Sequence, residues 1–393
     1  MIYNVPRRSD SRQVWRMKRA VLFPFLALFA CSTNSAQPND AGADAFVDGA
    51  GDAAIDAATA YENAVLASSW QVLPNGPTVG GGAKQDDVFF LDAMNGWAAS
   101  GPNFAIYKTT DGGNTWTKTF TKQGTYFRAI LFLDSMHGFA GNLGAGLSAE
   151  ITDTNVLYET TDGGDTWNPV TNITGPAASG VCNLAAIDAT HLVAVGRANG
   201  PANLISSSDA GQTWTSIDLS SSFMMVIDAR FTSPTNGIVG GMDANGKANV
   251  MQTTDGQTFK TVFTSTTPNS LVWKMSFPSD QVGYVAIQDA TEGPPTFAKT
   301  TDGGNTWTEM PLPMQGTSSK TAYPAIGIGF ITENVGWVSP EDSTLPTYVT
   351  SDGGNTWTQD PSLKSPVNRF RFVDQNTAYA IGASVWKLSI QYP

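Results

Sequence analysis

A short motif that recurs at a nearly constant spacing constrains the fold more than any other feature of the chain. It reads TTDGGNTW at residues 109–116 and returns five times in related form, which places aspartates at positions 111, 162, 209, 255, 302 and 352. A fixed period of about 40–50 residues is typical of proteins that stack one supersecondary unit after another. The sequence therefore predicts a repeat protein over most of its 393 residues.

A second, weaker motif precedes each aspartate motif. It consists of an apolar segment, a short turn and a glycine followed by small or apolar residues, and its seven copies begin near residues 86, 127, 182, 225, 272, 325 and 368. Alternation with a period of two predicts β-strands, four in each unit. Four antiparallel strands in a unit of this length are typical of a propeller blade. We therefore predict an all-β fold, a seven-bladed β-propeller.

The seven first strands outnumber the six aspartate turns, and this mismatch predicts how the ring closes. The last unit ends with a third strand at residues 384–389, and no fourth strand follows it before residue 393. Residues 68–74 (SSWQVLP) look like the missing fourth strand, with Trp70 in the place of Trp116. We expect this N-terminal strand to complete the last blade, because closure removes the open sheet edges of a linear array.

The aspartate motif resembles the Asp box, also called the bacterial neuraminidase repeat, which lies between the third and fourth strands of a blade. We expect its aspartate to accept backbone N–H bonds across a tight turn, its glycine to supply a positive φ, and its aromatic ring to pack into the blade. This interpretation makes the motif structural and not catalytic. The residues concerned are Asp111, Gly113, Trp116, Asp162, Gly164, Trp167, Asp209, Gly211, Trp214, Asp255, Phe259, Asp302, Gly304, Trp307, Asp352, Gly354 and Trp357. The fourth copy lacks one residue, which predicts a tighter turn there.

The N-terminus reads as an export signal. Lys18 and Arg19 precede an apolar run, Ala20–Ala30, which is too short to span a bilayer, and Cys31 follows. The segment resembles the lipobox of bacterial lipoproteins, which implies a lipidated Cys31 as mature N-terminus and, with Ser32 after it, an outer-membrane location. The alternative is an ordinary cleaved signal peptide in which Cys31 is incidental. We expect residues 1–30 to be the signal region, with Met17 the true start.

Two further regions complete the predicted organisation. Residues 31–64 are rich in Ala, Asp and Gly and have few large apolar side chains, so we predict a disordered tether. Residues 65–393 are predicted to form the propeller. The only attachment to the cell envelope would be the lipid on Cys31.

The charge and the residue composition limit which classes of partner, metal and cofactor we expect. The formal net charge is −12, which excludes nucleic acid because phosphate binding needs a basic surface. The two cysteines lie in unlike contexts, so we expect no disulfide framework. The two histidines are isolated in the sequence, so we expect no metal site. We also find no nucleophile elbow, phosphate loop or zinc motif. The expectation is a monomer without metal or cofactor.

Alignment of the seven first strands brings charged residues to the rim where these strands begin. The candidate binding residues are Asp86, Asp87, Arg128, Asp228, Arg230, Trp273, Lys274, Arg369 and Arg371. Two interpretations remain open, since mixed charges around a channel either pair with one another or hold a ligand. In both, we expect the functional rim to lie opposite the Asp boxes.

The pairing of FLDAMNGWAASG with TTDGGNTW resembles the photosystem II assembly and stability factor family over Ser68–Ser389. The resemblance implies a seven-bladed propeller that acts as a chaperone-like binding platform. It also implies an arginine-rich patch, to which the basic residues named above would contribute. We therefore expect a non-catalytic scaffold, anchored at the cell surface, for a protein or glycan partner. The alternative is a glycoside hydrolase of the sialidase or xyloglucan-hydrolase type, which needs two facing carboxylates; Asp87 and Asp228 are the only candidates.

Overall fold

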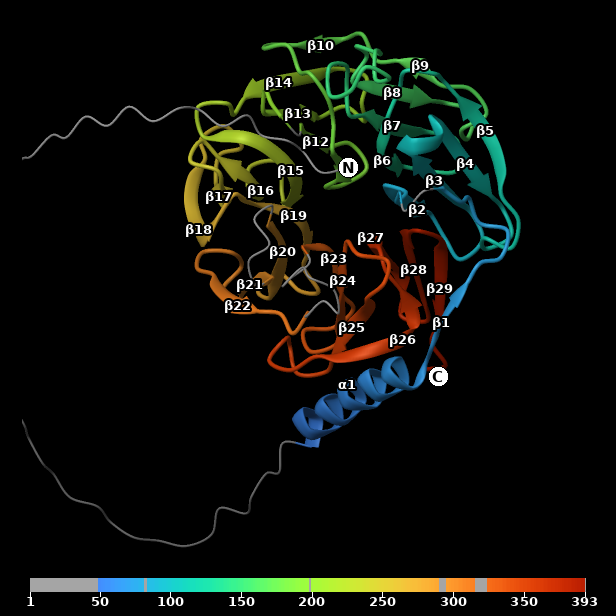
Figure 1. Ribbon diagram of the computed structural model, residues 1–393, viewed down its shortest axis with the longest axis vertical. Coiled ribbons are helices and arrows are strands. Elements are labelled where there is room, and N and C mark those ends of the chain that lie inside the picture. The colour runs from blue at the N-terminus through green and yellow to red at the C-terminus, as the bar shows by residue number, and fades with distance from the viewer. Residues whose placement is uncertain (1–48, 81–82, 198, 290–294, 315–323, 393) are drawn as a thin grey trace, which may run out of the picture. The chain divides into compact units, whose positions relative to one another are not determined.

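Seven sheets surround a central channel, and in the described part of the chain an α-helix precedes them (Figure 1). The computed structural model describes residues 49–80, 83–197, 199–289, 295–314 and 324–392. The sheets confirm the predicted seven-bladed β-propeller. Residues 1–48, with the predicted signal region and Cys31, lie outside the described residues.

Six blades each take four consecutive strands, ordered from the channel outward. Blade 1 consists of β2 (Asp87–Phe90), β3 (Gly96–Ser100), β4 (Ala105–Thr109) and β5 (Thr117–Thr121), and blade 2 of β6 (Phe127–Phe132), β7 (Gly138–Asn142), β8 (Leu157–Thr160) and β9 (Asn168–Pro169). Blade 3 consists of β11 (Asn183–Ala186), β12 (Leu192–Gly196), β13 (Asn203–Ser207) and β14 (Trp214–Asp218), with β10 (Ile173–Thr174) added in parallel at its outer edge.

The remaining blades follow the same plan. Blade 4 consists of β15 (Phe223–Phe231), β16 (Gly237–Asp243), β17 (Lys247–Thr253) and β18 (Lys260–Pro268), and blade 5 of β19 (Ser270–Ser276), β20 (Gly283–Asp289), β21 (Thr296–Thr300) and β22 (Thr308–Pro311). Blade 6 consists of β23 (Ala325–Phe330), β24 (Gly336–Pro340), β25 (Pro346–Thr350) and β26 (Thr358–Lys364). Blade 7 consists of β27 (Val367–Asp374), β28 (Thr377–Gly382), β29 (Val385–Ser389) and the N-terminal β1 (Trp70–Val72).

The predicted closure of the ring is confirmed. Strand β1 pairs antiparallel with β29, and Trp70 lies opposite Leu388. The Trp70 side chain is 2% exposed and makes edge-to-face contacts with the rings of Trp337 in blade 6 and Phe370 in blade 7. Trp70 therefore occupies the place that box tryptophans hold in other blades, and it joins the two ends of the chain.

Each Asp box fastens two turns of its own blade. In the first box, Asp111 accepts hydrogen bonds from the backbone N–H of Thr115 at 2.9 Å and from the hydroxyls of Thr115 and Thr109 at 2.6 and 2.8 Å. Gly113 has φ 88°, a conformation that glycine adopts without strain. The N–H of Gly112 then donates to the carbonyl of Met94 in the turn between the first and second strands.

The bond between these two turns recurs in the other five boxes. The pairs are Gly163 with Met136, Ala210 with Thr190, Gly256 with Thr235, Gly303 with Gln281, and Gly353 with Asn334. All six boxes therefore lie at the end of the channel where the first strands finish, which we call the box face. In the shorter fourth box the carboxylate of Asp255 reaches the N–H groups two and three residues ahead, at 2.8 and 2.7 Å, which is the tighter turn expected there.

The tether predicted over residues 31–64 needs a correction in its C-terminal part. Helix α1 spans Gly49–Ala67, because a segment with eight alanines has high helix propensity as well as low hydrophobicity. One face of the helix packs on the ring: Val65 is fully buried, and the rings of Tyr61 and Tyr392 lie 5.1 Å apart. The carboxylate of Glu62 accepts a hydrogen bond from Thr332 at 2.8 Å. Among the described residues, no helix is long and apolar enough to cross a membrane.

The Asp box makes a prediction about acid stability. Hydrogen bonds from the side chain and then the backbone of Thr115 lower the pKa of Asp111 to about 2. Because an unfolded aspartate titrates near pH 4, the stabilisation is complete above about pH 4 and is lost as the pH falls through about 2. Asp111→Asn should therefore lower the thermal midpoint most at pH 5–7, and the difference from wild type should shrink by pH 2.5. Asp56→Asn, an exposed change on α1, is the charge-matched control; a pH-independent loss for Asp111→Asn would contradict this account.

Candidate binding site in the central channel

The end of the channel where the first strands begin is filled by side chains. Asp86 is completely buried and forms an ion pair with Arg128 at 2.8 Å. The guanidinium of Arg128 lies 4.6 Å from the centre of the Trp273 ring, and the Trp273 Nε1–H donates to Asn368 Oδ1 at 2.9 Å. These contacts join blades 1, 2, 5 and 7 across the channel.

An apolar cluster surrounds Trp273 at the same end. It contains Leu143, Cys182, Ile227, Met242, Leu271 and Ile326, all less than a tenth exposed. Three of the predicted rim residues (Asp86, Arg128 and Trp273) are therefore interior residues. The loops and long strands of blades 2, 4 and 5 bring large apolar side chains over the rim positions, so the described part of this end is packed. That a partner binds at this rim stays a prediction.

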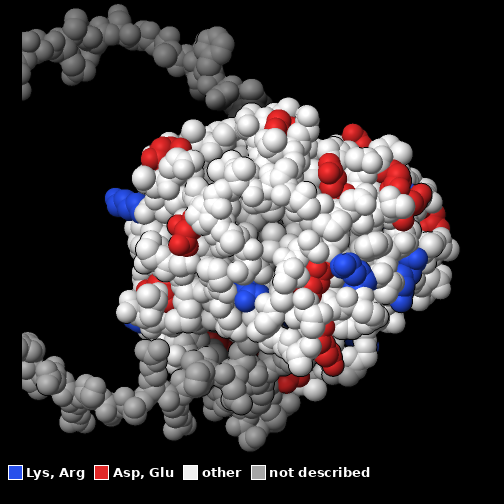
Figure 2. Space-filling view, turned by 90° about the horizontal axis from the view of Figure 1, so that it is seen from above, with Lys and Arg blue, Asp and Glu red and all other residues white. Residues whose placement is uncertain are grey.

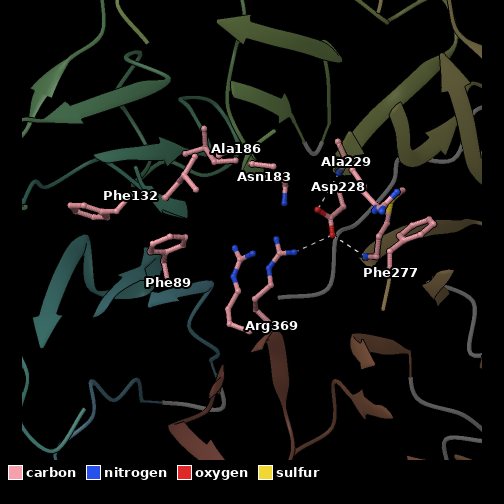
Figure 3. Close-up of a pocket in the computed structure, with 14 residues that line it drawn as sticks. Phe89, Phe132, Asn183, Ala186, Asp228, Ala229, Phe277 and Arg369 are labelled. Atoms are coloured by element: carbon pink, nitrogen blue, oxygen red, sulfur yellow. Dashed lines mark hydrogen bonds and ion pairs between the residues drawn. The ribbon is translucent and has the colours of Figure 1, made fainter. Parts of the chain in front are cut away.

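The next layer of the channel is an ionic network around Arg369. Its Nη1 lies 3.2 Å from Asp228 of blade 4 (Figure 3). Its Nε lies 3.5 Å from Asp87 of blade 1. Arg371 adds two contacts of 2.9 Å from Nη2 to the two Asp87 oxygens. Asp87 and Asp228 lie in different blades, as predicted, but an arginine from blade 7 holds both of them.

Both carboxylates also serve the backbone of the following blade. Asp87 accepts the N–H of Ile130 at 3.2 Å, and Asp228 accepts the N–H of Met275 at 2.9 Å. These two N–H groups occupy equivalent positions on the inner edge strands of blades 2 and 5. Since an inner edge strand has no neighbour to pair with, the aspartates satisfy donors that burial would otherwise leave unpaired.

Two lysines add positive charge near this network. Lys274 is 1% exposed, and burial, followed by repulsion from Arg369, lowers its pKa well below the usual value. Lys84 donates to Asn368 at 3.1 Å, and its pKa falls to about 8 through burial and the neighbouring Arg128. Lys84 is not among the residues predicted from the sequence, because it precedes β2 and lies outside the repeat pattern.

A cavity of about 430 Å³ occupies the other half of the channel, towards the box face. Arg230 and Arg371 line it and are about a quarter exposed, and Arg369 and Asp228 line its inner end. The apolar part of the lining was not predicted from the sequence; it includes Phe89, Leu131, Met275 and Phe277. These residues occupy the third to fifth positions of the aligned first strands, so extending the same alignment further along the strands would have included them.

Arg230 is held at the edge of this cavity and not in the central network. Its Nη2 lies 2.6 Å from the exposed Asp280, and its guanidinium stacks 4.6 Å from the Phe277 ring centre. The structure thus brings Asp87, Asp228, Arg369 and Arg371 into one network and leaves Arg230 apart. Within the described ranges, no group of His, Cys, Asp and Glu could hold a metal ion.

The buried and exposed ion pairs should differ sharply in their effect on stability. Asp228→Ala removes the hydrogen-bonded partner of the buried Arg369 and the acceptor of the Met275 N–H, so we expect the free energy of unfolding to fall by about 3–5 kcal/mol. Asp280→Ala breaks a pair whose carboxylate is 81% exposed, and the loss should stay below about 1 kcal/mol. Urea unfolding measures both, and equal losses would contradict the structural role given to Asp228.

The chain matches no family model and no curated protein by sequence. Among solved structures, it resembles YCF48 bound to a D1 peptide, with a TM-score of 0.59 at 18% identity over 82% of this chain and 97% of that one. YCF48 from Cyanidioschyzon merolae gives a TM-score of 0.58 at 16% identity over 82% and 99%. A GH74 xyloglucanase from Xanthomonas campestris gives 0.56 at 14% identity and covers 81% of this chain but 53% of the enzyme.

These likenesses confirm, at the level of the fold, the resemblance to the photosystem II assembly factor family that the repeat motifs predict. They include both peptide-binding and hydrolytic proteins, so the fold alone leaves the function open.

Proposed function

We propose that this protein is a non-catalytic binding scaffold that presents its propeller to a protein or glycan partner at the cell envelope. The main support for this proposal is that the two facing carboxylates, Asp87 and Asp228, are buried and already paired. Asp87 is completely buried and Asp228 is 2% exposed, and arginines and backbone N–H groups occupy both. A glycosidase needs one carboxyl group to reach the glycosidic oxygen and another to reach the sugar or a water molecule. Neither group is exposed for such a role.

The binding role draws support from the relatives by fold. YCF48 is described in complex with a D1 peptide, and this chain covers nearly all of that propeller. The present chain carries a net charge of −12, and Figure 2, seen at right angles to Figure 1, shows acidic side chains scattered over a mainly uncharged face, with a few Lys and Arg side chains among them. Such a surface favours recognition through many weak polar contacts over capture of a polyanion.

A second candidate, a glycoside hydrolase, rests on the likeness to the xyloglucanase. This chain corresponds to about half of that enzyme, which is consistent with one propeller of a larger catalytic assembly. The burial of Asp87 and Asp228 argues against this candidate for the present channel.

The lipid anchor on Cys31 is part of the proposal and has its own test. The full chain expressed with its leader in a Gram-negative host should incorporate labelled palmitate and sediment with membranes. Cys31→Ser should lose both properties, while Cys182→Ser, a change at the buried cysteine, should keep them. Equal labelling of the wild type and the Cys31→Ser variant would refute the anchor.

Binding without turnover is the central prediction. The purified chain should bind at least one member of a peptide or glycan array saturably and should release no reducing sugar from xyloglucan or chromogenic glycosides. Failure of the protein to bind any member of either array would count against its proposed role as a binding scaffold. Hydrolysis that Asp87→Asn or Asp228→Asn abolishes, and that the exposed Asp280→Asn retains, would establish the hydrolase instead, provided that unfolding curves show all three variants folded.

A further inference from the structure

The cavity on the box-face side of the channel has an apolar part that a partner can reach. Phe89, Ala185, Met275 and Phe277 line it and are partly exposed, and we call the space between them the recess. Figure 3 shows Phe89 and Phe277 on opposite sides of Arg369. The volume of about 430 Å³ lies near the lower end of the range of ligand pockets, about 300–1,000 Å³. The recess therefore suits one large side chain of a partner.

Two arginines at the edge of the recess favour an aromatic side chain over an aliphatic one. The side chains of Arg230 and Arg371 are 25% and 28% exposed, and their charges are balanced by Asp280 and Asp87 at 2.6 and 2.9 Å. The guanidinium of Arg230 already stacks on Phe277, 4.6 Å from the ring centre. Because aromatic rings attract both guanidinium groups and the edges of other rings, an aromatic side chain gains contacts in the recess beyond simple burial.

Acidic side chains surround the box-face end of the channel. Six of the seven turns between first and second strands carry one, in the turn or directly before it, and all six are exposed: Asp92, Asp134, Asp188, Asp280, Glu333 and Asp374. The carboxylate of Asp134 accepts the N–H groups of Met136 and His137 at 2.7 and 2.8 Å, which lower its pKa. Its charge is therefore present at neutral pH, and its position is fixed before any partner binds.

The lysines of the box face lie farther from the channel. Lys108, Lys299 and Lys387 belong to third strands, and their amino groups lie against the boxes of the following blades. Nearer the channel, the side chains of Met94 and Met136 are 51% and 52% exposed, in the same turns as two of the acids. Methionine side chains adapt readily to a bound surface. This end of the channel thus combines a reachable apolar recess with negative surroundings.

From these observations, we propose that the box-face end of the channel binds an extended peptide segment in which basic residues flank an aromatic side chain. The aromatic ring enters the recess between Phe89 and Phe277, and the flanking lysines or arginines contact the acidic turns. A glycan would need neutral polar groups in the lining, and Asn183, the one such side chain among the described lining residues, is only 4% exposed. The inference rests on the proposed scaffold function and adds the chemistry of the partner.

The probe is the peptide GKKWKKG, blocked at both ends, and its comparisons are GKKAKKG and GEEWEEG. Isothermal titration of the full chain at about 50 mM salt should give saturable binding of GKKWKKG. Loss of the ring should weaken binding about tenfold or more, and reversal of the charges should abolish it. Binding should also weaken as the salt rises to about 300 mM, because exposed ion pairs are screened. Equal binding of either comparison, or no binding of GKKWKKG at about 1 mM, would overturn the proposal.

Two substitutions test whether the recess is the site. Ala185→Trp fills it from the inner strand of blade 3, at a partly exposed position that carries no polar group. This variant should bind GKKWKKG about tenfold more weakly and keep the wild-type circular dichroism spectrum. Ser221→Trp, in the exposed turn between β14 and β15 at the other end of the channel, should bind like the wild type. Unchanged binding by a folded Ala185→Trp variant would refute the site.

A matched pair of triple variants tests the acidic turns. Each replaces three aspartates that accept backbone N–H bonds, and asparagine keeps an acceptor at each position. The box-face variant carries Asp92→Asn, Asp134→Asn and Asp374→Asn, and the control at the other end carries Asp218→Asn, Asp243→Asn and Asp342→Asn. The first should bind about fivefold more weakly or less, and the control should change less than about twofold. Equal losses in the two variants would contradict binding at the box face.

The outcome also separates this inference from the scaffold proposal. If GKKWKKG does not bind while another peptide or a glycan binds saturably, the inference is wrong and the scaffold proposal stands. If no peptide and no glycan binds, both are wrong.

Discussion

Pairing between β1 and β29 turns a row of seven sheets into a closed ring, and the channel exists only because the ring is closed. Without β1, blade 7 would expose the outer edge of β29, and the two ends of the array would be free to separate. The seam is joined twice. Outside, Trp70 packs between blades 6 and 7; inside, Arg371 of blade 7 binds Asp87 of blade 1, 284 positions away in sequence.

The interior of the ring shows why charged residues persist in a place where burial is costly. The innermost strands have no inward neighbour, so their N–H groups need acceptors from side chains. Asp87 and Asp228 supply acceptors at equivalent positions of two blade junctions, and Arg369 then balances both charges. The backbone therefore needs the two carboxylates, and the carboxylates need the arginines to balance their charge.

The repeat pattern predicted the fold in detail, including closure by Trp70, because blade architecture depends on local periodicity and turn chemistry. Helix α1 was missed, since alanine lowers hydrophobicity and raises helix propensity at the same time. Contacts with the ring, such as that of Val65, favour the helix over disorder, and they cannot be read from the local sequence.

What the alignment could not show was which end of the channel stays open. That depends on how Leu143, Met242 and Leu271 pack against Trp273, which is a matter of loop conformation and not of period. The residues chosen from the sequence were therefore largely the right ones for the channel, while the face expected to bind was the filled one.

The position of α1 has a mechanical consequence. The helix leads directly into β1, so any pull on the N-terminal segment enters the folded domain at the seam of the ring. The buried Val65, the Tyr61–Tyr392 contact and the Glu62–Thr332 hydrogen bond lie ahead of β1 along this load path. These contacts would therefore have to break before such a pull could separate β1 from β29.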